Sequence, residues 1–156
     1  MGAAIPITYP TSYAALVYRA NLRAGETLLV HAAAGGVGSA AVQIGRALGA
    51  RVIAAAGGAE KAEIVRALGA NEGIDYREED FSARVNELTS GRGADVIYDP
   101  VGGDVFDQSL KCIAWNGRLL VIGFASGRIP DVKVNRILLK NIAVVGIHWG
   151  AYRDNE

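Results

Sequence analysis

The sequence predicts an α/β fold in which a six-stranded parallel sheet carries helices on both faces. Three observations lead to this prediction. Short apolar runs typical of buried strands alternate with segments whose apolar residues recur at helical spacing. The first strand runs directly into a glycine-rich turn that opens a helix. The five residues 46–50 recur unchanged as 66–70, so two successive helices end on the same glycine stop. Such alternation is typical of a doubly wound sheet.

The residues ahead of the first strand, 1–26, form a lead-in segment that we expect to contain a helix. Thr11 or Ser12 could cap this helix, because a hydroxyl oxygen can accept a hydrogen bond from an N–H group of the first turn. The helix would end near Ala20. No low-complexity linker divides the chain, so we expect one domain over residues 1–156, within the usual domain size of roughly 100 to 200 residues.

Strands and helices then alternate to the end of the chain. Each strand prediction rests on an apolar run bounded by turn residues, such as the Asn116-Gly117 pair before the fifth strand. The first two helices after the lead-in segment stop at Gly49 and Gly69. The predicted strands span residues 27–32, 51–56, 73–76, 95–101, 118–124 and 142–149, and the predicted helices span 37–48, 60–68, 80–88 and 106–113.

Composition excludes several classes of protein. Hydrophobic residues make up 51% of the chain and charged residues 21%, which is enough apolar material for a core. Sixteen basic and sixteen acidic residues give zero net charge, which argues against binding to nucleic acid or to an acidic membrane surface. No apolar run approaches a membrane span. The lone Cys112 favours a reducing, cytoplasmic setting, and His31 and His148 are too few for a metal site.

The glycine-rich turn has the sequence Ala-Ala-Ala-Gly-Gly-Val-Gly over residues 32–38, between a strand and a helix. This context is typical of the dinucleotide-binding fingerprint of Rossmann-type folds, in which the helix N-terminus receives the pyrophosphate. Gly35 and Gly38 hold the second and third glycine positions. Ala33 replaces the first, so the backbone there must keep a negative φ. We expect nucleotide binding, with a glycine turn used only for packing as the alternative.

The end of the second strand decides between NAD and NADP. An NAD site usually has a carboxylate there for the ribose hydroxyls, but residues 54–58 are Ala-Ala-Ala-Gly-Gly. Lys61 could reach a 2'-phosphate, and the small turn leaves room for it. We therefore expect NADP(H). Lys61 could instead be a solvated helix lysine, and Glu60 beside it weakens the case for a phosphate.

With these residues in place, the chain resembles the cofactor-binding half of the zeta-crystallin-like quinone oxidoreductases, in the medium-chain dehydrogenase/reductase superfamily. The similarity covers nearly the whole chain. It is carried by Leu-Val-His-Ala-Ala-Ala-Gly-Gly-Val-Gly at 29–38, Asp-Pro-Val-Gly-Gly at 99–103, Gly-Phe-Ala-Ser-Gly at 123–127, and Leu-Lys-Asn-Ile at 139–142 followed by Gly146.

The resemblance implies cofactor-binding residues at the carboxyl ends of the strands. Gly58 departs from many relatives, which have a hydroxyl residue there. Tyr76 could alternatively end a strand with its ring half buried, Gly102 could only start a helix, and Phe124 could be a core aromatic. The implied residues are Ala34, Gly35, Gly36 and Val37 at the pyrophosphate, Gly57, Gly58, Lys61 and Tyr76 around the 2'-phosphate, Gly102 close to the cofactor, and Thr11, Phe124, Ala125 and Ser126 near the nicotinamide.

The activity implied is hydride transfer from NADPH to a quinone or another α,β-unsaturated carbonyl compound, without zinc. In this family a GroES-like catalytic domain completes the enzyme, and we expect it to be absent from residues 1–156. The chain alone would then be inactive or nearly so, and we assign no catalytic residue. Two alternatives are a non-catalytic nucleotide-binding module and an enoyl-reductase domain of a larger synthase. The last strand, from Ile142 to Trp149, is apolar and predicts a homodimer through the sheet edge.

Overall fold

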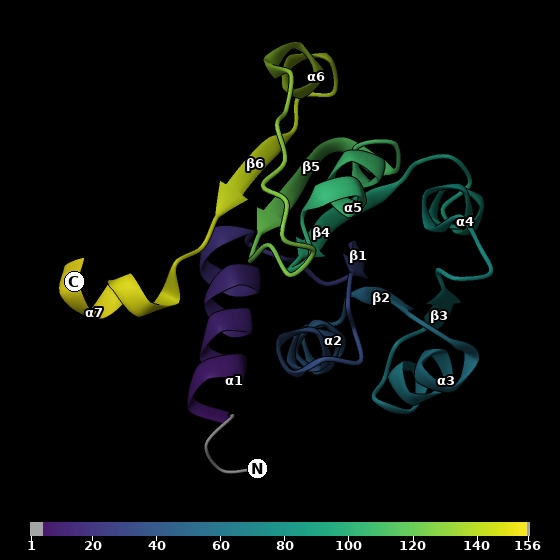
Figure 1. Cartoon of the computed structure of the whole chain (residues 1–156), viewed down its shortest axis with the longest axis horizontal. Helices are drawn as coiled ribbons and strands as arrows, with labels where there is room; N and C mark the ends of the chain where they lie inside the picture. Colours follow the sequence, from purple (N-terminus) through teal and green to yellow (C-terminus); the bar gives the residue numbers. More distant parts are fainter. Residues whose placement is uncertain (1–4, 156) are drawn as a thin grey trace.

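The six strands form one sheet, with the order β3-β2-β1-β4-β5-β6 and every neighbouring pair parallel. The structure is a computed structural model that describes residues 5–155 (Figure 1). The strand order reverses direction beside β1, where the chain crosses from the β2-β3 half to β4, and ligands of open parallel sheets bind at such a point. The predicted doubly wound α/β fold is therefore confirmed.

The strands and helices alternate along the chain as expected (Figure 1). The strands are β1 (Thr27–Val30), β2 (Arg51–Ala56), β3 (Glu72–Asp75), β4 (Ala94–Asp99), β5 (Ile113–Val121) and β6 (Ala143–Gly146). The helices are α1 (Ile5–Tyr13), the π-helical η1 (Ala14–Arg19), α2 (Gly36–Ala47), α3 (Ala59–Ala67), α4 (Phe81–Leu88), α5 (Gly103–Ser109), α6 (Val134–Leu139), the 3-10 turn η2 (Trp149–Ala151) and α7 (Tyr152–Asn155).

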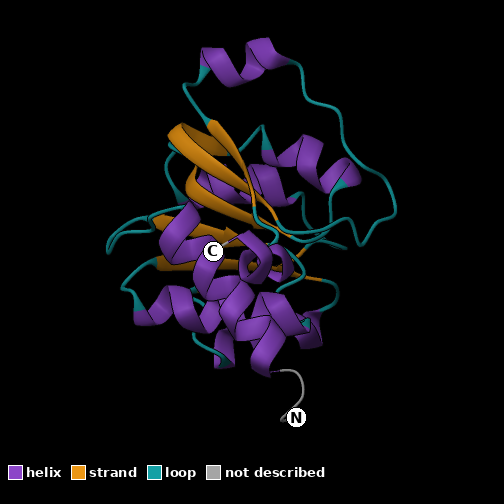
Figure 2. Ribbon diagram, turned by 90° about the vertical axis from the view of Figure 1, so that its left-hand side faces the viewer, coloured by secondary structure: helices purple, strands orange, loops and turns teal. Residues whose placement is uncertain are grey.

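Helices cover both faces of the sheet (Figure 2). Along β1, Leu28 and Val30 pack in one apolar cluster with η1, α2 and α3, while Leu29 packs in a second cluster with α4 and α5. All four residues of β1 are buried, because a central strand of a parallel sheet has helices above and below it. The two layers bury every residue of β1 and β4, and these two strands lead into turns that form the candidate site.

The N-terminal helix differs from its prediction. Thr11 and Ser12 lie near the end of α1, which already includes Ile5, and not at the helix start. The Ser12 hydroxyl donates to the carbonyl oxygen of Val37 at 3.0 Å and lies 2.8 Å from the hydroxyl of Tyr98. Ser12 therefore links α1 to α2 and the sheet instead of capping a helix. Residues 1–4 of the lead-in segment lie outside the described part of the chain.

Two predicted boundaries near the fifth strand are wrong. The helix predicted over residues 106–113 is α5, which spans Gly103–Ser109. β5 begins at Ile113, and the Asn116-Gly117 pair forms an irregularity within it, where the pairing with β4 shifts register. Asn116 adopts a φ of +62°, and a Cβ on Gly117 would lie 2.5 Å from Cγ1 of Ile113. A turn signal in the sequence therefore marks a bulge inside one strand.

The last strand is also shorter than predicted. β6 spans only Ala143–Gly146, and Trp149 begins the η2 turn. β6 pairs with β5 alone, so it is the edge strand that the sequence predicts. The preceding helix, α6, was not predicted, because its six residues are too few for a helical period and none of them is buried. No helix among the described residues is long and apolar enough to cross a membrane.

Candidate functional site

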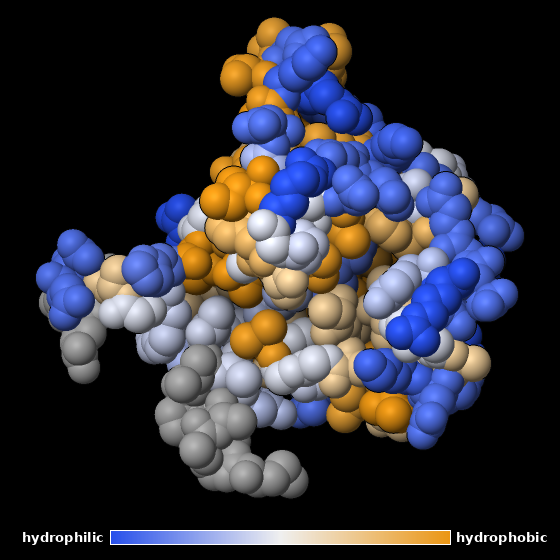
Figure 3. Space-filling model, in the orientation of Figure 1, coloured by the Kyte–Doolittle hydropathy of each residue, from blue (hydrophilic) through white to orange (hydrophobic). Residues whose placement is uncertain are grey.

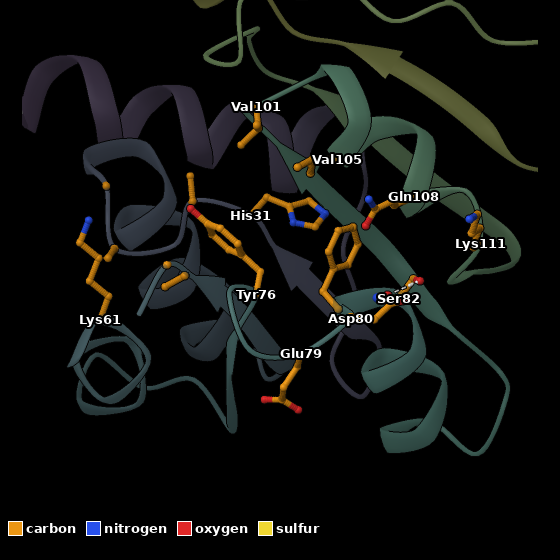
Figure 4. Close-up of a pocket in the computed structure, with 16 residues that line it drawn as sticks. His31, Lys61, Tyr76, Glu79, Asp80, Ser82, Val101, Val105, Gln108 and Lys111 are labelled. Atoms are coloured by element: carbon orange, nitrogen blue, oxygen red, sulfur yellow. Dashed lines mark hydrogen bonds between the residues drawn. The ribbon is translucent and has the colours of Figure 1, made fainter. Parts of the chain in front are cut away.

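A cavity of about 740 Å³ lies at the carboxyl ends of β1, β2, β3 and β4 (Figure 4). This is the edge of a parallel sheet at which ligands bind in open α/β folds. Both polar and apolar side chains line it. The lining residues are His31, Ala32, Ala34, Gly35, Ala56, Gly57, Lys61, Tyr76, Glu79, Asp80, Phe81, Ser82, Val101, Val105, Gln108 and Lys111.

The glycine-rich turn connects β1 to α2 at one side of this cavity. Ala33 keeps a negative φ, as predicted, and the left-handed conformation falls on Ala32, with a φ of +48°. Gly35 is the N-cap of α2 and offers no side chain to the first turn. The backbone N–H groups at the start of this 12-residue helix therefore have no capping side chain and carry the positive end of the helix dipole. They suit an anion such as a pyrophosphate.

The turn after β2 places three side chains around two glycines. A Cβ on Gly57 would lie 2.6 Å from the hydroxyl oxygen of Tyr76 and 3.3 Å from Nε of Arg77. A Cβ on Gly58 would lie 3.8 Å from Nη1 of Arg77, and the φ of +105° at Gly58 favours glycine in any case. The Tyr76 hydroxyl and the Arg77 guanidinium thus lie against the backbone of this turn, and Lys61 follows it in the first turn of α3.

Lys61 and Arg77 are exposed, and among the side chains that the structure describes neither of them forms an ion pair. Two unneutralised cations beside a glycine turn suit a dianionic group such as a phosphate monoester. Sequence reasoning found Lys61 but missed Arg77. Arg77 follows the end of β3, and β3 pairs with β2, so the ends of the two strands lie side by side. This position after a neighbouring strand was the feature of the sequence that could have indicated Arg77.

A carboxylate near this turn was also missed. Asp75 ends β3, and its Oδ1 accepts hydrogen bonds from the backbone N–H groups of Gly58, at 2.9 Å, and Arg77, at 3.0 Å. The second strand ends without a carboxylate, as the sequence shows, but its neighbour supplies one. Because Asp75 is engaged with the backbone, it fixes the turn and the start of the Arg77 segment relative to each other.

The turn between β4 and α5 forms a third side of the site. Asp99, 1% exposed, accepts hydrogen bonds from the N–H groups of Val101, at 2.8 Å, and Gly102, at 3.0 Å. Burial raises the pKa of Asp99, and these two bonds oppose that shift. The loop after β5 docks here, because Ala125 and Ser126 donate their N–H groups to the carbonyl oxygens of Pro100 and Val101 at 3.1 and 2.9 Å.

The structure brings together part of the residue set that the sequence analysis proposed. Three of these residues, Gly36, Gly58 and Gly102, directly follow residues that line the cavity, and Val37 comes one position later. Thr11 lies on α1 outside the lining. Phe124 is 42% exposed and so is not a core aromatic. The loop residues Phe124, Ala125 and Ser126 lie outside the lining as well. Five of the proposed residues line the cavity, namely Ala34, Gly35, Gly57, Lys61 and Tyr76.

His31 directly follows β1 and lines the cavity, although the residue is only 3% exposed. Its Nε2 lies 2.8 Å from Oγ of Ser109, and its ring meets Phe81 edge-on, with ring centroids 4.7 Å apart. Burial lowers the pKa of His31 to about 3, so the ring is neutral near neutral pH. Within the described part of the chain, no group of three His, Cys, Asp or Glu is placed to hold a metal ion.

Comparison with known proteins identifies the family. The model of the zinc-binding dehydrogenase family matches residues 36–156 of the chain. The chain belongs to this family. It therefore falls within the medium-chain dehydrogenase/reductase superfamily, as the sequence resemblance implied. Quinone oxidoreductase-like protein 2 homolog from Nematostella vectensis is 49% identical over 155 residues, which are 99% of this chain and 42% of that protein.

Solved structures of family members share the fold over nearly the full chain. The quinone oxidoreductase of Pseudomonas syringae pv. Tomato has a TM-score of 0.89 at 39% identity, over 97% of this chain and 47% of that one. A mycobacterial protein solved in complex with NADPH has a TM-score of 0.87 at 37% identity, over 94% of this chain and 45% of that one. The chain thus spans less than half the length of these relatives, and family membership supports binding of a nicotinamide cofactor.

Proposed function

We propose that this zinc-binding dehydrogenase family member is the NADP(H)-binding domain of a zinc-independent quinone oxidoreductase-like enzyme. The observation that carries the proposal is the turn at Gly57 and Gly58, which Tyr76, Arg77 and Lys61 surround at the carboxyl edge of the sheet. A 2'-phosphate fits two unneutralised cations and a phenol there, and an unphosphorylated ribose leaves both cations without a partner. The turn lies beside the glycine-rich turn, which is the spacing that a dinucleotide requires.

Different residues of the chain bind different parts of the cofactor. The N–H groups at the start of α2 bind the pyrophosphate, and Gly102 with the loop 124–126 lies at the nicotinamide end together with Thr11. When bound, NADPH supplies a hydride to a quinone or another α,β-unsaturated carbonyl compound. The chain orients the cofactor and covers it on one side, and we assign no catalytic residue to it.

The substrate side of the enzyme belongs to a GroES-like catalytic domain, and this part of the proposal rests on the family resemblance. The matched relatives are more than twice as long as this chain, which leaves room for such a domain. Without it the cofactor is open to water on one side, so we expect hydride transfer by residues 1–156 alone to be slow or absent. The buried Cys112 is the only cysteine in the sequence and has no partner for an internal disulfide, which is compatible with the reducing, cytoplasmic setting that we expect.

Titration of the chain with NADPH and with NADH tests the proposal. We expect NADPH to bind at least about 10-fold more tightly, because a charge-assisted hydrogen bond to a phosphate contributes more than a neutral one. Calorimetry or the intrinsic tryptophan fluorescence provides the measurement. Equal affinities, or tighter binding of NADH, contradict NADP specificity, and the absence of any binding contradicts the proposal as a whole.

We further propose that the chain forms a homodimer through the open edge of the sheet. β6 pairs on one side only, and α6 beside it carries apolar side chains that are largely exposed: Val134 at 74%, Leu138 at 78% and Leu139 at 71%. Figure 3 shows hydrophobic residues gathered on the α6 projection at the top of the molecule. An unpaired strand with apolar residues beside it favours association with a second copy.

Sedimentation velocity at micromolar concentration tests the dimer. We expect twice the mass of the chain, and we expect Leu138→Asp, which places a charge on the apolar face of α6, to give the monomer mass. Ile64→Asp also places a charge at an exposed apolar residue, but on α3, beside the β2-β3 end of the sheet; it is the control and should leave the dimer intact. A monomeric wild-type chain contradicts this part of the proposal and leaves cofactor binding untouched.

A further inference from the structure

The hydrogen bonds around His31 determine which of its two ring nitrogens carries the proton. Ser109 has a single hydroxyl proton, and its Oγ donates that proton to the carbonyl oxygen of Val105 at 2.7 Å. Towards His31 the same oxygen can then only accept, so the contact at 2.8 Å requires a proton on Nε2. Because the buried ring is neutral, Nδ1 carries no proton and is a hydrogen-bond acceptor.

The position of the ring is fixed as well. The side chain is almost fully buried at the end of β1, held by Ser109 at one nitrogen and by the edge-on contact with Phe81. Nδ1 has no hydrogen-bond partner among the residues that the structure describes. Figure 4 shows the ring pointing into the cavity, between Tyr76 on one side and Gln108 on the other. Among the described residues no fully buried side-chain nitrogen or oxygen lacks a hydrogen-bond partner, so the unpartnered Nδ1 is open to the cavity. An acceptor in this position suits a ligand that donates a hydrogen bond there.

The surroundings of His31 suit a flat, largely apolar heterocycle. Ala34, Val101 and Val105 line the same cavity, and Phe81 adds an aromatic ring. Lys61 marks the phosphate side of the cavity, beside Tyr76 in Figure 4. The base of a dinucleotide whose 2'-phosphate lies at Lys61 therefore enters the part of the cavity that His31 lines.

We propose that Nδ1 of His31 accepts a hydrogen bond from the exocyclic amino group of the cofactor's adenine, and so selects adenine over a base with a carbonyl at C6. This inference rests on the proposed function, because it assumes that a dinucleotide occupies the cavity. The physical basis is complementarity of donor and acceptor. Adenine offers N–H donors at C6, whereas hypoxanthine offers a carbonyl oxygen, and that oxygen would face the lone pair of Nδ1 in a site shielded from water.

Titration with two cofactors tests this selection on the intact chain. The probes are NADPH and nicotinamide hypoxanthine dinucleotide phosphate in its reduced form. Their purines differ at C6, where a carbonyl oxygen replaces the amino group, and at N1, which carries a proton in hypoxanthine and none in adenine. We expect the hypoxanthine cofactor to bind about 10-fold or more weakly, the usual scale for a buried polar group left unpaired. Equal affinities overturn the inference while leaving the proposed function intact. If neither cofactor binds, the proposed function itself fails.

Two variants test whether His31 is the residue that selects adenine. In His31→Phe the acceptor is gone and the ring volume is kept, so the ratio of the two affinities should fall to about one. In Gln108→Ala, which removes a neighbouring hydrogen-bonding side chain that also lines the cavity, the ratio should stay as in the wild type. A ratio that survives His31→Phe, or that Gln108→Ala abolishes, overturns the assignment to His31.

A spectroscopic readout on the wild-type chain is independent of whether His31→Phe folds. The nitrogen-15 resonance of Nδ1 should have the shift of an unprotonated imidazole nitrogen and should move when NADPH binds, as an acceptor nitrogen does on receiving a hydrogen bond. The hypoxanthine cofactor, added to saturation, should cause a clearly smaller change. A protonated Nδ1 in the free chain, or identical changes with both cofactors, contradicts the proposed contact.

Discussion

Replacing Gly38 by alanine is expected to destabilise the fold by about 3 kcal/mol and to abolish measurable NADPH binding. A Cβ at this position would lie 2.3 Å from the carbonyl oxygen of Ala32 and 2.9 Å from Cα of Ala33. Both are backbone atoms, so no side-chain rotation relieves the contact, and α2 must move away from β1. That movement displaces the N–H groups at the start of α2, which we propose as the pyrophosphate ligands. The higher helix propensity of alanine, about 1 kcal/mol, offsets only part of the cost.

Urea denaturation of the variant measures the change in free energy of unfolding, and calorimetry measures NADPH binding. Gly150→Ala is the matched control, because a Cβ there meets only Nε2 of His148 at 3.9 Å. The control should keep the wild-type stability to within about 0.5 kcal/mol and bind NADPH normally. If Gly38→Ala behaves like this control, the close approach of α2 to the glycine turn does not occur in solution.

Reversing the charge of Arg77 is expected to weaken NADPH binding about 100-fold and to change NADH binding little. The guanidinium lies against Gly57 and Gly58 without a carboxylate partner among the described side chains, so its charge is available to the 2'-phosphate. In Arg77→Glu a negative charge faces that phosphate instead, while NADH has no phosphate at this place. Titration of the variant with both cofactors gives the ratio of affinities.

Arg23→Glu makes the same change of charge ahead of β1, at the opposite edge of the sheet, and should leave the ratio unchanged. An Arg77→Glu ratio equal to that of this control shows that Arg77 does not bind the phosphate. Lys61→Ala separates the two interpretations of Lys61 in the same assay. A selective loss of NADPH affinity identifies a phosphate ligand, and an unchanged ratio identifies a solvated helix lysine.

The fold was predictable because its signals are local. A parallel strand covered on both faces is a continuous apolar run, as in residues 28–30, and helices that pack on a sheet repeat apolar residues at helical spacing. Glycine stops such as Gly49 and Gly69, both with positive φ, mark where helices end. These signals depend only on neighbours in sequence, so they set the order and type of nearly all elements.

The wrong predictions lie where contacts between distant parts of the chain determine the local structure. Ser12 has the side chain of a helix cap, but its contacts to Val37 and Tyr98, from elements far along the chain, place it inside a helix. The Asn116-Gly117 pair has the sequence of a turn, yet the pairing of β5 with β4 absorbs it as a bulge. Neither outcome can be inferred from a window of sequence, because the deciding partner lies elsewhere in the chain.

The candidate site divides in the same way. The glycine-rich turn and the small turn after β2 were predictable, since a strand, a turn and a helix in succession place them at the carboxyl edge of the sheet. Arg77 and Asp75 come to the same turn only through the pairing of β3 with β2. His31 acquires its acceptor nitrogen through Ser109, which is 78 positions away in sequence and belongs to α5. Sequence patterns give the glycine-rich turn and Lys61, while Arg77 and His31, which we propose to contact the phosphate and the base, come to the site only through the assembled sheet.

A crystal structure of the chain with NADPH bound tests the central claim most directly. The account predicts the pyrophosphate at the N–H groups of Gly36 and Val37, the 2'-phosphate between Lys61 and Arg77 over the Gly57-Gly58 turn, and the adenine amino group at Nδ1 of His31. A cofactor bound elsewhere on the chain, or one whose 2'-phosphate points away from Lys61 and Arg77, would contradict it.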